Sequence, residues 1–191
     1  VATPDGGACI LFRVNFIPGS GVQNALLVRL NSDGSTLWSK MITVPTITSY
    51  GLSVRLAISS SGEPFVFAYG SRSVVTKLDA NGDLLWCRRV WDSDPLSSFE
   101  NSNTLIPTSD GGCAFLGGSF SSQPDSSIVV GRLDAQGDVI WINAYSNPQQ
   151  GVEVNRSSIT VDEDDNITLM SPAPWSTNTY TSLSLRLDPS G

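Results

Sequence analysis

A short segment recurs four times along the chain and constrains the fold more than any other feature. In each copy a basic residue and a leucine lead into a polar turn that ends in glycine. The copies are Leu27–Gly34, Val75–Gly82, Val130–Gly137 and Ser184–Gly191. They align without gaps, and their final glycines are 48, 55 and 54 residues apart. A constant unit at this spacing is typical of a repeat architecture.

Two further features recur with the same unit. In the first three copies a tryptophan follows the glycine by four positions, at Trp38, Trp86 and Trp141. A second polar turn precedes each copy and is followed by an apolar run; these turns are 3–7, 59–63, 108–112 and 162–166. The apolar segments alternate and are rich in β-branched residues, and no window has a helical period. Each unit therefore predicts four short strands, which in the second unit are 53–59, 65–70, 74–79 and 83–90. Asp33-Gly34 and Asn81-Gly82 predict two-residue type I′ hairpin turns.

Four antiparallel strands in roughly 40–55 residues are the pattern of a β-propeller blade. The hairpin Leu78-Asp79…Gly82…Trp86 and its counterparts resemble the quinoprotein-like and related bacterial β-propeller repeats over essentially the whole chain. The resemblance implies an all-β fold and no particular activity, because such propellers serve as enzymes, scaffolds and adhesins. We expect part of a single propeller of about three and a half blades, cut at both ends, with the remaining blades supplied by missing chain or another subunit. The expected blades are 1–43 (partial), 53–90, 103–145 and 156–191 (partial), with 14 strands.

The expected topology places the connections on two opposite faces. If A to D are the strands of a blade, tight turns join A to B and C to D on one face. The B–C and D–A loops share the other face and are longer and unequal, which is where binding residues usually lie. Four loop aromatics are the candidate binding residues, because an indole or phenol ring can hold a sugar or a partner's apolar anchor. They are Trp91, Trp175, Tyr180 and Tyr50; the alternative is that they pack locally within the loops.

Composition excludes several classes of function. The net charge is −7 with a pI near 4.4, whereas a nucleic-acid surface needs clustered Lys and Arg. No apolar stretch is long enough for a membrane span. The chain has no histidine, which removes the commonest general base and most zinc chemistry. We therefore predict no catalytic, metal-binding or cofactor-binding residue, and no cofactor.

Two sets of residues invite a more specific hypothesis. Asp162, Asp164 and Asn166 alternate like the start of an EF-hand, but Ile167 stands where the bend glycine belongs. We favour a solvated turn. The three cysteines, Cys9, Cys87 and Cys113, have no metal-binding spacing, and we expect small buried hydrophobic residues, with Cys9 and Cys113 in separate sheets. Asn155 and Asn166 begin glycosylation sequons, which have meaning only in a secreted eukaryotic protein.

A basic residue holds one position in every repeat, at Arg29, Lys77, Arg132 and Arg186. With a two-residue turn, the first three lie opposite Trp38, Trp86 and Trp141. We expect the stem of each cation to lie along the opposed indole and stabilise the blade. One extra residue in the turn would shift the register and separate the pair.

The favoured function is a non-enzymatic structural or adhesion module that binds protein or glycan at its loop face. A Ser/Thr/Asn-rich, lysine-poor chain suits a cell surface, a secreted protein or a virion appendage. The alternatives are a lectin-type propeller, or an enzyme whose quinone or metal site lies outside this segment.

Overall fold

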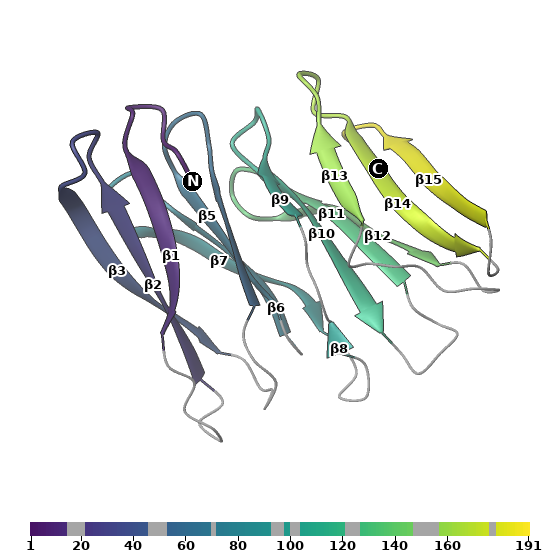
Figure 1. Ribbon diagram of the computed structural model, residues 1–191, viewed down its shortest axis with the longest axis horizontal. Coiled ribbons are helices and arrows are strands. Elements are labelled where there is room, and N and C mark those ends of the chain that lie inside the picture. The colour runs from purple at the N-terminus through teal and green to yellow at the C-terminus, as the bar shows by residue number, and fades with distance from the viewer. Residues whose placement is uncertain are drawn as a thin grey trace. The chain divides into compact units, whose positions relative to one another are not determined.

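The repeats fold into four consecutive antiparallel sheets (Figure 1). The computed structural model describes residues 1–14, 22–45, 53–69, 72–92, 98–99, 104–120, 127–146, 157–175 and 179–191. These residues are all strand or turn, and no helix occurs among them. The predicted all-β class and the predicted succession of sheets are therefore confirmed.

The first two sheets are simple meanders. The first has the order β1-β2-β3, with β1 (Ala8–Val14), β2 (Val22–Leu30) and β3 (Thr36–Pro45). The second has the order β4-β5-β6-β7, with β4 (Ser53–Ile58), β5 (Pro64–Tyr69), β6 (Arg72–Leu78) and β7 (Leu84–Asp92). Because consecutive strands pair antiparallel, the β4–β5 and β6–β7 turns lie at one end of the sheet and the β5–β6 connection at the other.

The third and fourth sheets repeat this plan with one addition. The third pairs β12 (Val139–Ser146), β11 (Ser127–Leu133) and β10 (Cys113–Phe120) with β9 (Thr104–Pro107), and the fourth pairs β13 (Ser158–Val161), β14 (Ile167–Trp175) and β15 (Thr179–Leu187). A short strand, β8 (Ser98–Phe99), also pairs with the end of β10. It lies in a predicted loop, so the described strands number 15 instead of the expected 14.

The chain divides into two compact units, Val1–Asp92 and Ser93–Gly191, each holding two sheets packed face to face. In the first unit the shared core contains Cys9, Leu27 and Ile42 of the first sheet; from the second sheet it takes Val66, Ala68, Val74 and Leu78. In the second unit Ala114, Leu116, Ile128, Val130 and Trp141 of the third sheet meet Ile159, Ile167 and Leu169 of the fourth. Alternate residues of each strand supply these cores, as the period of two requires.

The hairpin turns differ from the prediction in a way that preserves the register. Gly34 and Gly82 have positive φ, of 84° and 81°, but Asp33 and Asn81 do not, so these are not type I′ turns. Asp79 N–H donates to Asp83 O and Gly82 N–H to Asp79 O, which is a type I turn closed by a glycine bulge. A second bulge then skips one residue of the next strand, so that Lys77 still lies opposite Trp86. The same shift in the first and third sheets keeps Arg29 opposite Trp38 and Arg132 opposite Trp141.

Candidate functional site

The structure places three of the four candidate binding aromatics at strand ends. Trp91 belongs to β7 and pairs with Ser73, so it is not in the predicted D–A loop. Trp175 ends β14 and Tyr180 lies in β15, within a segment predicted as one long loop. Pro174 pairs with Tyr180 and Trp175 with Thr179, which brings the two aromatic positions to the same hairpin end. Tyr50 lies outside the described residues, as do most residues of the predicted B–C and D–A loops.

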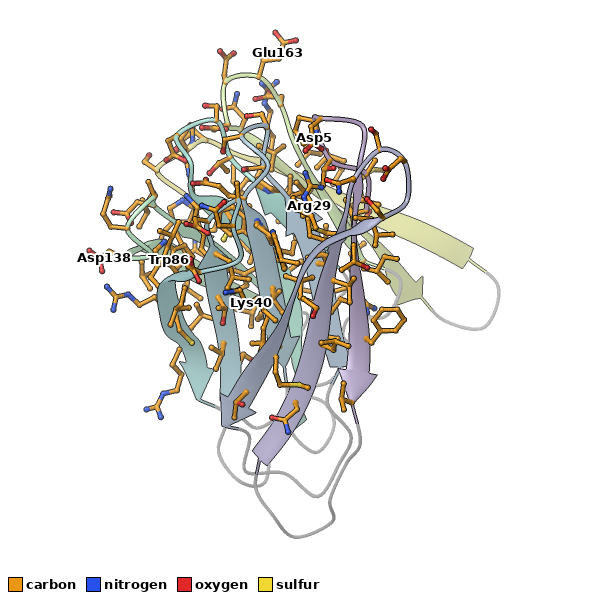
Figure 2. The ribbon with its side chains drawn as sticks, turned by 90° about the vertical axis from the view of Figure 1, so that its left-hand side faces the viewer. Asp5, Arg29, Lys40, Trp86, Asp138 and Glu163 are labelled. Carbon is orange, nitrogen blue, oxygen red and sulfur yellow. The ribbon has the colours of Figure 1, made fainter. Side chains whose placement is uncertain are left out.

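The opposite end, formed by the tight turns, carries a charged interaction in every sheet. The repeated basic residue binds an acidic residue of the preceding tight turn in its own sheet. Arg29 Nη2 donates to both carboxylate oxygens of Asp5 at 2.7 Å (Figure 2). Lys77 Nζ lies 2.9 Å from Glu63 Oε2, and both cations are about 5% exposed in their side chains. The carboxylate of the turn therefore offsets the cost of burying the cation.

The third and fourth sheets make the same interaction from the third and the first residue of their turns. Arg132 Nη2 binds Asp110 Oδ2 at 3.0 Å, and Arg186 Nη2 binds Asp162 Oδ2 at 2.7 Å. The acid is thus the first, third or fifth residue of the turn, depending on the repeat. Sequence comparison at fixed positions missed the pairing for this reason; the signal was that every such turn holds at least one acid. The predicted opposition of base and indole is confirmed, but the bases have carboxylate partners, and Lys77 Nζ lies over the Phe65 ring, 5.2 Å from its centroid.

The repeated tryptophan joins one sheet to the next. Trp38 Nε1 donates to Ala80 O, in the β6–β7 turn of the second sheet, at 2.9 Å. Trp141 Nε1 donates to Pro189 O, at the corresponding place beyond β15, at 3.0 Å. A Cβ added at Gly82 would lie 3.0 Å from the Trp38 ring, and one at Gly191 2.8 Å from the Trp141 ring. These glycines therefore let the indole lie flat on the turn, and the predicted structural role of the two tryptophans is confirmed.

The second unit adds a buried carboxylate between its sheets. Asp165 of the fourth sheet accepts hydrogen bonds from Ser109 N–H and Ser109 Oγ at 2.8 Å and from Arg132 Nη2 at 3.0 Å. Arg132 Nη1 also donates to Pro189 O at 3.0 Å. Among the described residues Asp165 is the one non-glycine residue with a positive φ, 60°. Its left-handed conformation is compensated by these bonds to the third sheet.

The turn carboxylates have altered acidity. The Thr3 hydroxyl, then the Arg29 guanidinium and the Gly7 N–H, lower the pKa of Asp5 to about 2. Burial raises the pKa of Asp110, but bonds from Thr108 and Gly112 and the Arg132 charge outweigh it and leave the pKa lowered. Such carboxylates are held as anions, which suits ion pairing and opposes a role as general acid.

The structure also bears on the more specific hypotheses. Asp162 Oδ1 accepts the backbone N–H of Asp164 and of Asn166 within a closed turn, as the turn interpretation predicted. Within the described ranges no group of three or more potential metal ligands occurs, and no helix there could cross a membrane. Cys9 and Cys113 are buried in separate sheets as expected, but Cys87 is exposed, so the prediction that it is buried was wrong.

No model of a protein family matches the sequence, and no curated protein matches it. A solved structure of a protein of unknown function from Bacteroides caccae is similar at 12% identity and a TM-score of 0.48, over 93% of this chain and 58% of that one. An endo-arabinase from Bacteroides thetaiotaomicron is similar at 12% identity and a TM-score of 0.39, over 92% of this chain and 72% of that one. The chain thus spans less than two thirds of the first of these proteins.

Proposed function

We propose that the chain is part of a β-propeller that serves as a non-enzymatic structural or binding module. The observation that supports this most is the repeated contact between sheets. In both units a tryptophan on the last strand of one sheet donates to the turn after the third strand of the next, Trp38 to Ala80 after β6 and Trp141 to Pro189 after β15. A contact that repeats from sheet to sheet is the way in which repeat proteins build a continuous core.

The charged residues at the tight-turn end support a structural role over a catalytic one. Each of the four repeated cations is paired with a carboxylate of its own sheet. A catalytic group has no reason to recur in every repeat, whereas a brace between a strand and a turn does. The loop face therefore remains the best place for a ligand, because variable loops on a rigid scaffold commonly bind.

The β14–β15 hairpin is the best candidate for the binding element. Trp175 and Tyr180 lie at adjacent pairs of its strands, two aromatic positions at one hairpin end. Successive pairs of a ladder alternate between the two faces of a sheet, so this hairpin end carries one aromatic position on each face. An aromatic residue at such a position suits a sugar ring or an apolar anchor of a partner protein. We propose that the partner is a glycan or a protein at a cell surface, in a secreted assembly or on a virion.

A glycan array probed with the labelled chain tests the binding role. We expect Trp175→Ala and Tyr180→Ala each to weaken binding to the selected glycan at least about tenfold, a loss that hot-spot aromatics typically produce. Met170→Ala is the matched control, because this exposed residue lies on the same strand, away from the hairpin end. Binding that survives both aromatic substitutions would contradict the assignment. A bound metal or a cofactor absorbance in the purified protein would favour the enzyme instead.

A further inference from the structure

The outer face of the first sheet is apolar and carries exposed side chains. Strand pairing places Ile10 opposite Val28 and Phe12 opposite Leu26, which is itself opposite Met41. These five side chains therefore share one face, the one turned away from the second sheet. Ile10, Phe12 and Met41 are 37%, 48% and 54% exposed. An exposed apolar patch of this kind usually marks an interface.

The repeat register shows what covers this face in other sheets. In the second sheet the positions of Ile10, Phe12 and Leu26 are held by Val66, Ala68 and Val74, at most 5% exposed and packed against the first sheet. In the fourth sheet the position of Ile10 is held by Leu169, fully buried against the third sheet. In both cases the covering sheet is the one that carries the docked tryptophan.

The turn after β2 also differs from the corresponding turns after β6 and β15, which lie against a tryptophan ring. Gly82 and Gly191 lie against the rings of Trp38 and Trp141, whereas a Cβ added at Gly34 would have no atom within 4 Å. Gly34 has a similar positive φ, 84° against 81° and 89°. The carbonyl of Ser32 stands two residues before Gly34, at the position of the carbonyls that accept the indole N–H groups. The first sheet thus has the carbonyl acceptor, the glycine turn and the apolar face, and among the described residues no indole lies on the Gly34 turn.

We propose that this face and the Gly34 turn form a docking site for a further tryptophan-bearing sheet of the same repeat, supplied from outside residues 1–191. The proposal rests on the propeller assignment and adds the site and its ligand group. The occupant donates an indole N–H to Ser32 O, lays its ring on Gly34, and covers the apolar face of β1, β2 and β3.

A second copy of these residues is a poor match for the site. The uncovered face of the fourth sheet carries Arg186 opposite Thr168, and Ser158 and Ser184 opposite Met170. This polar face would leave hydroxyl and guanidinium groups against Phe12 and Met41. The faces that cover their neighbours in this chain instead present small and aliphatic residues beside the tryptophan, such as Cys9, Leu27 and Ile42.

An indole probe tests the site directly. N-acetyl-L-tryptophanamide is titrated into the isotope-labelled 191-residue chain and followed by NMR. We expect saturable shifts at the amides of 31–35 and the side chains of Ile10 and Met41, with a dissociation constant on the order of a millimolar for so small a ligand. The turns at 79–83 and 188–191, already occupied by Trp38 and Trp141, are internal controls. No shift at 31–35 up to the solubility limit, or equal shifts at all three turns, would overturn the proposal.

A matched pair of variants separates the site from general effects on the fold. Asn tolerates a positive φ, so Gly34→Asn fills the site with little backbone cost. We expect it to weaken probe binding at least about tenfold. Gly62→Asn is the control: Gly62 has the same φ of 84°, an added Cβ there would meet only Pro4 Cδ at 4.0 Å, and its turn lies outside the site, so binding should be unchanged. If both variants bind equally, the indole site is wrong.

Sedimentation of the probe-free chain tests the source of the occupant. We expect it to remain monomeric. A concentration-dependent dimer that Phe12→Ser abolishes would overturn the proposal, because a second copy would then fill the face. None of these experiments involves the loop face, so a failure here leaves the glycan-array result standing, and the converse also holds.

Discussion

The two pairs of packed sheets share the tryptophan contact but surround it differently. In the first unit Pro4 stands near Gly62, with 4.0 Å between its Cδ and the position of an added Cβ. In the second unit the corresponding residues are Ser109 and Asp165, joined by two hydrogen bonds. One contact is thus made with a proline and a glycine, and the other with a hydroxyl and a buried carboxylate.

The hydrogen bonds of the arginine opposite each tryptophan also differ between the two units. Arg132 Nη1 donates to Pro189 O across the sheets, whereas Arg29 Nη1 is buried without a hydrogen-bond partner among the described residues. The polar pair therefore links its two sheets through Arg132 and Asp165 as well as through the indole. The indole on the glycine turn is thus common to both units, whereas the residues of the neighbouring contact differ.

Substitution of the two tryptophans should cause the largest losses of stability, and the two losses should differ. Trp141 is 8% exposed and Trp38 is partly exposed. We expect Trp141→Ala to lower the free energy of unfolding of the second unit by about 3–5 kcal/mol, and Trp38→Ala to lower that of the first by less, about 2–3 kcal/mol. Urea unfolding followed by amide signals of β14 and β5 reads the two units separately. Trp141→Phe, which keeps an aromatic ring and removes the N–H, should cost about 1–2 kcal/mol. A larger loss for Trp38→Ala would contradict the ranking.

The sequence was sufficient for the sheets and insufficient for their contacts. The repeated Gly34, Gly82 and Gly137 and the tryptophans four residues later predict the strands, their order and the pairing of base with indole. The turn type was wrong because an Asp-Gly or Asn-Gly pair fits both a type I′ turn and a type I turn with a glycine bulge. The register survived because the second bulge offsets the first.

The candidate site was less predictable because its parts vary between repeats. The acid that binds the basic residue moves from Asp5 to Glu63 to Asp162 in the turn, and only the folded hairpin shows that each reaches the same place. Asp165 stands where the other repeats have glycine, and its partner Ser109 lies 56 residues away in another sheet. Loops were predicted from Trp91 onward and around Trp175, but β7 runs on to Asp92 and β14 to Trp175. The serine and the two prolines of β14 resemble loop composition, which explains the second of these errors.

Removing the buried carboxylate should be the next largest effect. Asp165→Asn keeps a side chain that tolerates positive φ and removes the charge that Arg132 needs. Because Arg132 keeps Asp110, we expect a loss of about 2–4 kcal/mol from the second unit, within or slightly below the usual range for a broken buried pair. The measurement is again urea unfolding read at β14.

Two variants sharpen the comparison with the first unit. Asp164→Asn changes an exposed neighbour and should alter the stability by less than about 0.5 kcal/mol. Asp165→Gly restores the residue of the other repeats, which relieves backbone strain but leaves Ser109 and Arg132 without their acceptor. We expect it to remain less stable than the natural chain. A higher free energy of unfolding for Asp165→Gly would show that the polar contact of the second unit is less favourable than the proline–glycine contact of the first.

Acid should weaken the first unit through Asp5. Its pKa is about 2 in the folded chain against 3.8 for the free group, and the Thr3 hydroxyl and the Arg29 guanidinium cause the shift. Because the folded pKa is the lower one, the stabilisation is complete above about pH 4 and is lost as the pH falls towards 2. Urea midpoints of the first unit measured from pH 5 to pH 2 should therefore fall more steeply for the natural chain than for Asp5→Asn. Parallel curves would show that the carboxylate is not the titrating group.

The smallest effect should come from the exposed ion pair that accompanies Trp38. Lys40 Nζ lies 2.9 Å from Asp83 Oδ1, but the two side chains are 41% and 70% exposed. The Lys40 stem lies against the second-sheet turn, since its Cγ would be 3.0 Å from a Cβ at Gly82. Lys40→Met keeps that stem and removes the charge, so a double-mutant cycle with Asp83→Asn isolates the charge interaction. We expect a coupling of about 0.2–1 kcal/mol that declines with added salt, because exposed pairs are screened. In the second unit the residue corresponding to Lys40 is Asn143, whose Nδ2 donates to Gly191 O at 3.3 Å without any charge. A coupling energy above about 1 kcal/mol at high salt would contradict this, and would show that the Lys40–Asp83 ion pair helps the indole to join the first two sheets.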